Sequence, residues 1–250
     1  MSWNSTLGLI ALISLALPII LMVGLRLANY KTFPALFISI LFAFVYNFLN
    51  LGYVQVPKEV ITNLNFWNNM LDAPLMLLFL TYLSFSPLFA KRIRAGIMAY
   101  VIFEIVVIAF VGYNNQAMTI ILGPGLAAIF LLCFCCFIRH TKITIMHKKA
   151  SGRAIISAAL LFAYGCYFLI YLMYYVLRTP HVADTYLVYF LSVIFSSLLL
   201  SAGILIERRR VQKRNELIIT RKELSTLYND QVTKTPFKAA ILPFDRDQWN

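Results

Sequence analysis

Residues 65–80 read NFWNNMLDAPLMLLFL, a stretch that is apolar enough to lie in a bilayer yet carries several polar side chains. These polar residues recur at i, i+3, i+4 and i+7, the spacing of one helix face: Asn65, Asn68, Asn69 and Asp72. An ionisable group inside a membrane span is costly and normally faces the interior of a helix bundle. The stretch therefore predicts a membrane helix that presents Asp72 to the other helices.

The composition around this stretch is that of a polytopic membrane protein. Of the 250 residues 61% are hydrophobic and only 13% are charged, and the mean hydropathy is +0.78. A soluble domain is nearer half apolar and a quarter charged. The net charge of +12 fits the excess of Lys and Arg in cytoplasmic loops, so it does not call for nucleic acid as a partner. The partner that the composition implies is the lipid bilayer.

Long apolar runs predict an all-α bundle of seven transmembrane helices. At about 20 residues a span, seven spans use most of the chain and leave no room for a second folded domain. We expect a transmembrane domain over residues 1–206 and a basic tail over residues 207–250. The predicted spans are residues 7–27, 33–51, 65–89, 95–113, 118–138 (with a break at Gly123-Pro124-Gly125), 154–177 and 185–206.

The basic residues predict the orientation of this bundle. With the N-terminus outside, only Lys58 and Arg178 of the 22 Lys and Arg residues fall in outward segments. Lys and Arg concentrate in cytoplasmic loops, so the bias predicts an outside N-terminus and a cytoplasmic C-terminus. This alternation requires an odd number of spans. We expect a multi-pass protein of the plasma (inner) membrane.

The tail changes character at Glu207. Residues 207–230 are charged and helix-favouring, with apolar residues near heptad spacing. Such a basic helix could continue out of the last span and lie against anionic lipid headgroups. Alternatively, it is a short signalling or dimerisation helix, with a cytoplasmic protein or a second copy of the chain as its partner.

Catalytic and metal-binding motifs are missing from the sequence. The three histidines, His140, His147 and His181, fall in the predicted loops rather than in the spans. Intramembrane metallohydrolases need several His or carboxylate ligands at one depth, and no nucleophile elbow or phosphate-binding loop is present. The four cysteines lie in apolar runs and read as small buried hydrophobes. We therefore expect no catalytic site, no metal site and no enzyme activity.

Further polar and aromatic stripes could meet the Asp72 face. Tyrosines recur at helical spacing in the sixth span and serines in the seventh, although serines often serve only helix packing. The second span adds Tyr46, Asn47 and Asn50. A buried carboxyl needs a partner, so we expect a neutral Asp72 hydrogen bonded to Asn or Tyr. These stripes predict a pocket between the third, sixth and seventh spans for a neutral, mostly apolar ligand. Its candidate residues are Asn68, Asp72, Tyr164, Tyr167, Tyr171, Ser192 and Ser196.

The pattern of seven spans, with D72-A-P-L-M-L-L in the third, resembles the microbial (type I) rhodopsins. Aligned on Pro74, the family's counterion acid falls on Asn68 and its next polar residue on Asp72. In the sixth span Y164-G-C-Y167-F168 has the aromatic spacing of the family's Trp, Tyr, Pro signature. In the seventh span the family's Asp and its retinal-binding Lys fall on Ser192 and Ser196.

The departures from this family decide the expected function. A retinal Schiff base needs a primary amine, and every Lys of the chain lies in a predicted loop or in the tail. The resemblance thus implies a rhodopsin-like protein without its chromophore lysine, a lysine-less opsin. We expect no covalent retinal, no cofactor and no light-driven pumping, whereas a non-covalent isoprenoid ligand stays open.

Three functions remain on these grounds. The first is a non-enzymatic sensor or signalling protein with a small apolar-ligand pocket around Asp72. The second is a proton-linked transporter or carrier that uses Asp72 and Glu104. The third is a structural accessory subunit with a filled interior.

Overall fold

The computed structural model describes residues 3–28, 30–52, 54–84, 86–147, 150–177 and 182–231, and these residues form an all-helical chain. A π-helical turn, η1, continues α6 toward the loop before α7. The elements in order are α1 (Trp3–Gly24), α2 (Phe33–Asn50), α3 (Lys58–Leu83), α4 (Pro87–Val111), α5 (Asn115–His147), α6 (Ser151–Tyr171), η1 (Leu172–Val176) and α7 (Val182–Gln231).

Six of the described helices are long and apolar enough to cross a membrane: α1, α2, α4, α5, α6 and α7. The helix α3, which carries Asp72, is not among them, although it has 26 residues. The asparagines and Asp72 in its first half lower its hydropathy below that of the six candidate spans. The prediction of a multi-pass helical membrane protein is confirmed, with six candidate spans in the described residues instead of the predicted seven.

Helix boundaries differ from the predicted spans where polar sequence still favours helix. The helix α5 passes through Gly123, Pro124 and Gly125 without the expected break and runs on to His147. Two of the three histidines therefore lie in a helix, and the expectation that all three fall in loops was wrong. Span length is set by the apolar run, whereas a helix continues into water for as long as its backbone hydrogen bonds persist.

The third predicted span was too long at its C-terminal end. The helix α3 ends at Leu83, because Ser84 has extended backbone angles (φ −63°, ψ 148°). Ser86 then begins α4 as its N-cap, since its Oγ accepts a hydrogen bond from the backbone N–H of Phe89 at 3.1 Å. Pro87 suits the first turn of α4, where no N–H is needed.

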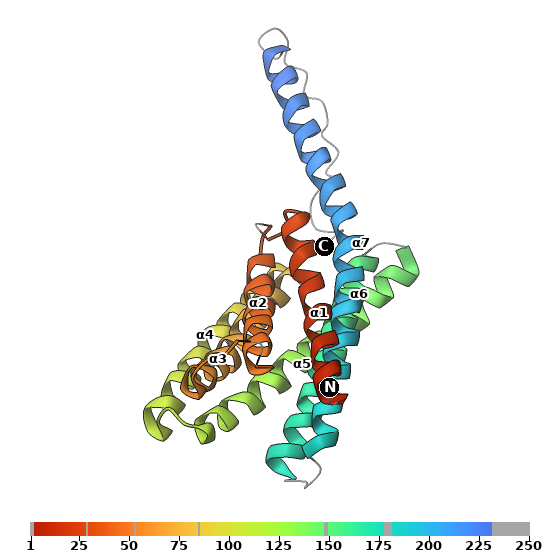
Figure 1. The fold of residues 1–250 in the computed structure, drawn as a ribbon. Helices are drawn as coiled ribbons and strands as arrows, with labels where there is room; N and C mark the ends of the chain where they lie inside the picture. The colour runs from red at the N-terminus through yellow and green to blue at the C-terminus, as the bar shows by residue number, and fades with distance from the viewer. Residues whose placement is uncertain are drawn as a thin grey trace.

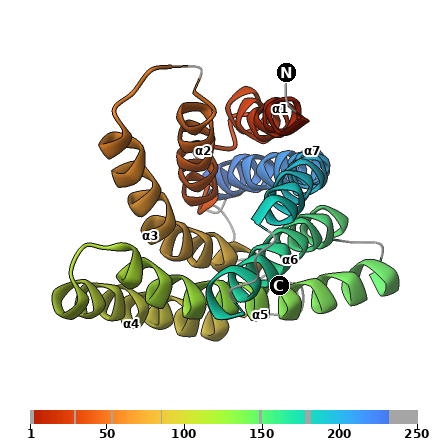
Figure 2. The ribbon, with the colours of Figure 1, turned by 60° about the horizontal axis from the view of Figure 1, so that its bottom comes forward.

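The helix α7 packs between α1 and α6, and α3 contacts α2, α4 and α5 (Figure 2). The 50-residue α7 extends beyond the other helices at one end of the bundle, here named the tail end (Figure 1). The opposite end, where α2 finishes and α3 starts, is named the cavity end. The described part of the tail thus continues α7 and projects away from the bundle.

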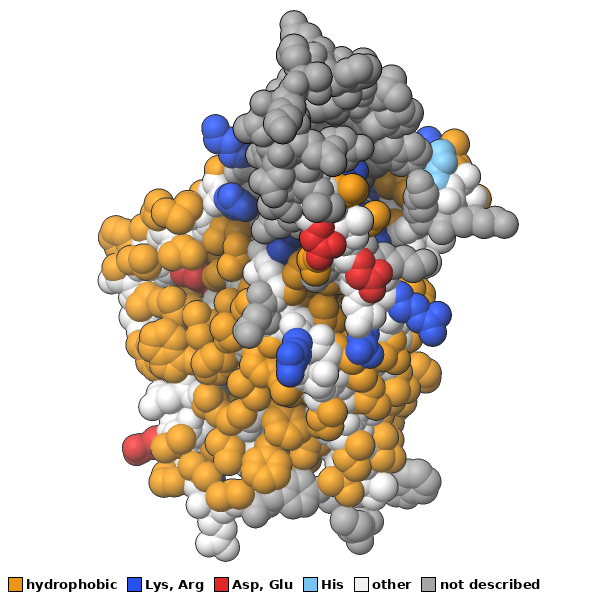
Figure 3. All heavy atoms as spheres, turned by 90° about the horizontal axis from the view of Figure 1, so that it is seen from above, with side chains coloured by type: hydrophobic (Ala, Val, Ile, Leu, Met, Phe, Trp, Pro, Cys, Tyr) orange, Lys and Arg blue, Asp and Glu red, His pale blue; other side chains and the backbone are white. Residues whose placement is uncertain are grey.

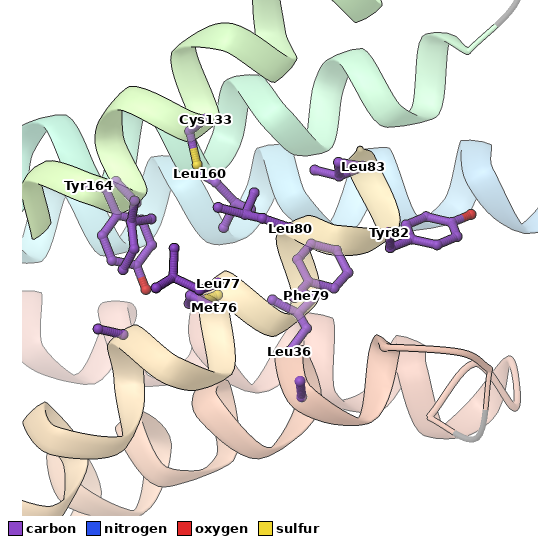
Figure 4. Packing of buried hydrophobic residues seen from close by; sticks show 14 of the residues in the cluster. Leu36, Met76, Leu77, Phe79, Leu80, Tyr82, Leu83, Cys133, Leu160 and Tyr164 are labelled. Carbon is purple, nitrogen blue, oxygen red and sulfur yellow. The ribbon is translucent and has the colours of Figure 1, made fainter. Parts of the chain in front are cut away.

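The core surrounds the second half of α3. Its residues Met76, Leu77, Phe79, Leu80 and Leu83 are all buried, and they pack against apolar side chains of α2, α5 and α6 (Figure 4). The first half of α3 instead carries the polar stripe. One helix therefore changes from an apolar, enclosed segment to a polar one near its middle.

The outer surface of the bundle is apolar. Large hydrophobic side chains are exposed on it, among them Phe110 (87% exposed) and Met98 (66%) on α4. Figure 3, seen from the tail end, shows Lys and Arg side chains standing out on a largely apolar surface. An apolar flank of this extent fits contact with lipid rather than with water.

Candidate functional site

A cavity of about 350 Å³ lies at the cavity end of the bundle. It is bounded by the end of α2, the first half of α3, the start of α5, the end of α6 with η1, and the start of α7. Its polar and aromatic lining consists of asparagines, one aspartate, tyrosines and a phenylalanine: Asn47, Asn50, Asn65, Asn68, Asn69, Asp72, Tyr46, Tyr167, Tyr171, Tyr174, Tyr189 and Phe190. Ala43, Leu122, Leu126 and Ile170 complete it.

Asp72 is held by two hydroxyl groups from different helices. Ser39 on α2 donates to Oδ1 at 2.7 Å, and Tyr164 on α6 donates to Oδ2 at 2.8 Å. Tyr164 is 2% exposed, and Figure 4 shows its hydroxyl directed toward α3. The expected hydrogen bond between Asp72 and a tyrosine is therefore present. The carboxyl group ties α2, α3 and α6 together while it still reaches the cavity.

The predicted pocket residues separate into those that line the cavity, one that contacts Asp72 from outside the lining, and the two serines of the seventh span. Asn68, Asp72, Tyr167 and Tyr171 line the cavity, and Tyr164 lies behind Asp72. Their role in ligand binding stays a prediction.

The two serines of the seventh span are placed differently. Ser192 donates to the carbonyl of Tyr189 at 2.8 Å, and Ser196 donates to that of Val193 at 3.2 Å. Both hydroxyls bond carbonyls of α7, and Ser192 also hydrogen bonds with Tyr167 on α6, but neither serine lines the cavity. This arrangement is that of serines that let helices pack closely.

Sequence reasoning singled out Tyr46, Asn47 and Asn50 in the second span but missed Ser39 on the same helix, α2. Ser39 bonds Asp72, and Asn47 donates through Nδ2 to the hydroxyl oxygen of Tyr189 at 3.1 Å, which joins α2 to α7. The signal was present in the sequence. Ser39, Tyr46 and Asn50 recur at i, i+7 and i+11, so they mark one polar face on an otherwise apolar helix.

Two tyrosines bind backbone carbonyls beside Pro124 in α5. A proline inside a helix lacks the N–H that would bond the carbonyl four residues earlier and disturbs the neighbouring bonds. Tyr100 on α4 donates to the carbonyl of Ile121 at 2.9 Å, and Tyr171 on α6 donates to that of Thr119 at 3.1 Å. Tyr171, which lines the cavity, therefore also stabilises α5 through this hydrogen bond.

Glu104 is the other acid that the sequence singled out. It lies on α4, is 1% exposed, and its Oε1 has no hydrogen-bond partner within the described part of the chain. It does not line the cavity. A buried oxygen of this kind is costly, and in a membrane such acids often have a function.

A second polar cluster lies at the tail end and was not predicted. Glu207 on α7 is 1% exposed, accepts a hydrogen bond from the Tyr82 hydroxyl at 2.6 Å, and lies 3.3 Å from Arg153 Nε and 3.7 Å from Arg210. The Arg153 guanidinium also lies over the Tyr82 ring at 4.7 Å. This tail-end cluster, defined as Tyr82, Arg153, Glu207 and Arg210, connects α3, α6 and α7.

His140 supports the same end of α3. Its Nε2 lies 2.8 Å from the carbonyl oxygen of Leu83, so this nitrogen donates to a carbonyl that the helix end leaves open. The side chain is 3% exposed, unlike a loop histidine. In the described residues no three His, Cys, Asp or Glu side chains gather as metal ligands would.

Comparisons with known proteins do not identify a family for this chain. No family model, no curated protein and no solved structure matches it. What stands is a multi-pass helical membrane protein with a polar and aromatic cavity near Asp72 and a buried ionic cluster at the opposite end.

Proposed function

We propose that this chain is a non-enzymatic sensor or signalling protein, in which a small molecule bound near Asp72 changes the state of the basic tail. The observation that carries the proposal is the cavity of about 350 Å³ at the cavity end. An accessory subunit that only packs against a partner would have a filled interior instead. The volume falls within the range typical of small-molecule sites, and several helices supply its walls.

The proposal includes α3 as a seventh span, with the N-terminus outside and the tail in the cytoplasm. A helix of 26 residues is about 39 Å long, more than the hydrocarbon core of a bilayer. Its contacts with α2, α4 and α5 support a place inside the bundle. The cavity would then open toward the outside of the plasma (inner) membrane. A rhodopsin-like origin without the chromophore lysine remains part of this proposal.

The same helices reach both the cavity and the tail. Asp72 and Tyr82 lie on α3, Tyr167 and Arg153 lie on α6, and Tyr189 and Glu207 lie on α7. A ligand that shifts any of these helices at the cavity end therefore acts on the tail-end cluster. Packed helices with two discrete arrangements are the usual carriers of such coupling.

The test fills part of the cavity with a chemical label, so the natural ligand need not be known. The variant Asn68→Cys is modified with methyl methanethiosulfonate in the full chain in nanodiscs, and hydrogen exchange is followed over residues 208–231. We expect a change in tail exchange after modification. Phe110→Cys is the matched control, because its side chain is 87% exposed on the lipid-facing side of α4. Unchanged tail exchange after complete modification of Asn68→Cys would refute the sensor.

A second candidate is a proton-linked carrier, which the buried Glu104 favours. Its Oε1 has no partner among the described residues, and Tyr100 lies one turn away on the same helix. The carrier predicts a pH-dependent flux in liposomes that Asp72→Asn and Glu104→Gln each abolish. A flux that survives both substitutions, or no flux from the unaltered chain, would count against it.

A further inference from the structure

The cavity wall is rich in groups that bind a polar ligand. Five asparagines line it, each with a carbonyl oxygen and an amide N–H₂, although Asn47 already bonds Ala43 and Tyr189, and Asn69 donates to Asn65. They come from the end of α2 and the first half of α3: Asn47, Asn50, Asn65, Asn68 and Asn69. The rest of the lining surface is mostly apolar, so the asparagines place hydrogen-bonding groups in an otherwise apolar wall. The bound molecule should carry hydrogen-bonding groups of its own.

The charge of the cavity narrows the ligand further. Asp72 is the one acid among its described lining residues, and none of these is Lys, Arg or His. The two hydrogen bonds from Ser39 and Tyr164 stabilise a carboxylate, because both hydroxyls can donate to it. A negative charge here has no positive partner among the described lining residues. A cationic ligand would supply that partner.

The aromatic side chains of the cavity also favour a cationic ligand. Tyr167 and Tyr189 lie with ring centroids 5.8 Å apart, and both rings border the cavity. An ammonium group is attracted to the face of a tyrosine ring, more strongly where water is excluded. Tyr46, Tyr171 and Tyr174 add further rings to the wall.

No other described group near Asp72 is a positive partner for its carboxylate. The titratable side chains that face it are phenols from three helices, Tyr100 on α4, Tyr164 and Tyr167 on α6, and Tyr189 on α7. The thiol of Cys133 on α5 lies near Tyr164. Phenols and thiols carry no positive charge. Neutralisation of a negative charge on Asp72 therefore depends on the molecule that enters the cavity.

We propose that the cavity binds a small organic cation, with an ammonium group paired to the Asp72 carboxylate and enclosed by tyrosine rings and asparagine carbonyls. The inference rests on the proposed function in one respect, that this cavity is the ligand site. If Asp72 is neutral in the free protein, as the sequence predicts, binding of the cation is accompanied by release of a proton. A neutral polyol, the other ligand that amides and tyrosines suit, would bind without that release.

The experiment compares phenethylamine with its neutral isostere 2-phenylethanol on the full chain in nanodiscs. Calorimetry in buffers of different ionisation enthalpy measures affinity and proton release together. We expect phenethylamine to bind with proton release and 2-phenylethanol to bind at least tenfold more weakly. Asp72→Asn should weaken phenethylamine binding at least tenfold. Glu59→Gln is the control, since Glu59 is an exposed acid at the start of α3 that lies outside the cavity lining, and it should leave the affinity within about twofold.

A second measurement covers the case in which Asp72→Asn does not fold. In Asn68→Cys, which keeps Asp72, phenethylamine should slow modification by methyl methanethiosulfonate, whereas 2-phenylethanol should not. Glucose serves as the probe for the neutral polyol. The proposal of a cationic ligand would be overturned by equal binding of phenethylamine and 2-phenylethanol, by tighter binding of the alcohol or of glucose, or by binding of neither phenethylamine nor the alcohol. The sensor would still stand in each case if modification of Asn68→Cys alters tail exchange, so the two failures are separable.

Discussion

At the residue scale, the buried carboxylate of Glu207 holds the helices together at the tail end. Glu207 is almost completely enclosed, and its Oε1 is shared by Tyr82 and two arginines. A buried carboxylate that loses a hydrogen-bond donor keeps its full desolvation cost. The cluster is therefore stable only while each of its partners stays in place.

Tyr82→Phe should lower the free energy of unfolding by about 1–3 kcal/mol, because Glu207 loses its shortest hydrogen bond while the ring under Arg153 is kept. Thermal unfolding of the full chain in nanodiscs measures the change. Tyr113→Phe is the matched control, since the Tyr113 side chain is 49% exposed and should tolerate the loss of its hydroxyl. Equal stability of the two variants would contradict a structural role for the Tyr82 hydroxyl.

At the residue scale the sequence predicted what lies on a single helix. Helical spacing identified the polar face of α3 and the tyrosines of α6, and the expected bond from Asp72 to a tyrosine is present. Glu207 was read only as the edge of a span, because its partners come from α3 and α6. Contacts between residues more than fifty positions apart depend on how the helices pack, which periodicity does not determine.

At the element scale, small residues set how closely helices approach. A Cβ atom added at Gly152 on α6 would lie 2.7 Å from the backbone nitrogen of Glu207 and 2.9 Å from its Cα. One added at Gly203 on α7 would lie 2.7 Å from Ile156 Cγ1. The two glycines thus let α6 and α7 pack backbone to backbone, as small residues do in membrane bundles.

Gly152→Ala should destabilise the protein by about 1–3 kcal/mol, since the backbone of α7 must shift to admit the methyl group. Gly96→Ala is its control. Nothing lies within 4 Å of a Cβ at Gly96 in α4, so removing a helix glycine there should stabilise by about 0.5–1 kcal/mol. Both changes are read from thermal unfolding, and a stable Gly152→Ala would rule out the tight α6–α7 contact.

Helix existence was predictable at this scale, while helix ends were not. The apolar runs identified each helix of the described chain, but α3 starts at Lys58 rather than near Asn65 and α5 continues to His147. Capping decides such ends, as Ser86 and Pro87 do for α4. Hydropathy alone also could not tell that α3, which is not among the candidate spans, lies between α2, α4 and α5.

At the scale of the whole molecule, the distribution of charge predicts the orientation. Among the residues that the structure describes, Lys58 at the start of α3 is the one Lys or Arg at the cavity end, and the others lie at the tail end or on the part of α7 beyond it. Positive residues are retained on the cytoplasmic side during insertion. The proposed topology therefore has the cavity and the tail on opposite faces of one membrane.

Reporter fusions at the two termini test this topology. Alkaline phosphatase should be active when fused to the N-terminal end behind an export signal, and green fluorescent protein should fluoresce on the C-terminal end. The exchanged pair of fusions is the control and should be silent. Two termini on the same side would require an even number of spans and would exclude α3 as the seventh.

The unbroken course of α7 has a mechanical consequence. Its 50 residues span about 75 Å, and the part after Glu207 accounts for about 36 Å of that length. A rigid rod that pivots at Glu207 transmits motion from one end to the other, so a tilt of about 5° within the bundle moves the far end of the rod by about 3 Å. A rearrangement no larger than a side-chain rotation beside Tyr189 is thereby converted into a displacement that a bound partner can register. The helix is a lever with two arms of about equal length, one in the cavity wall and one in the tail.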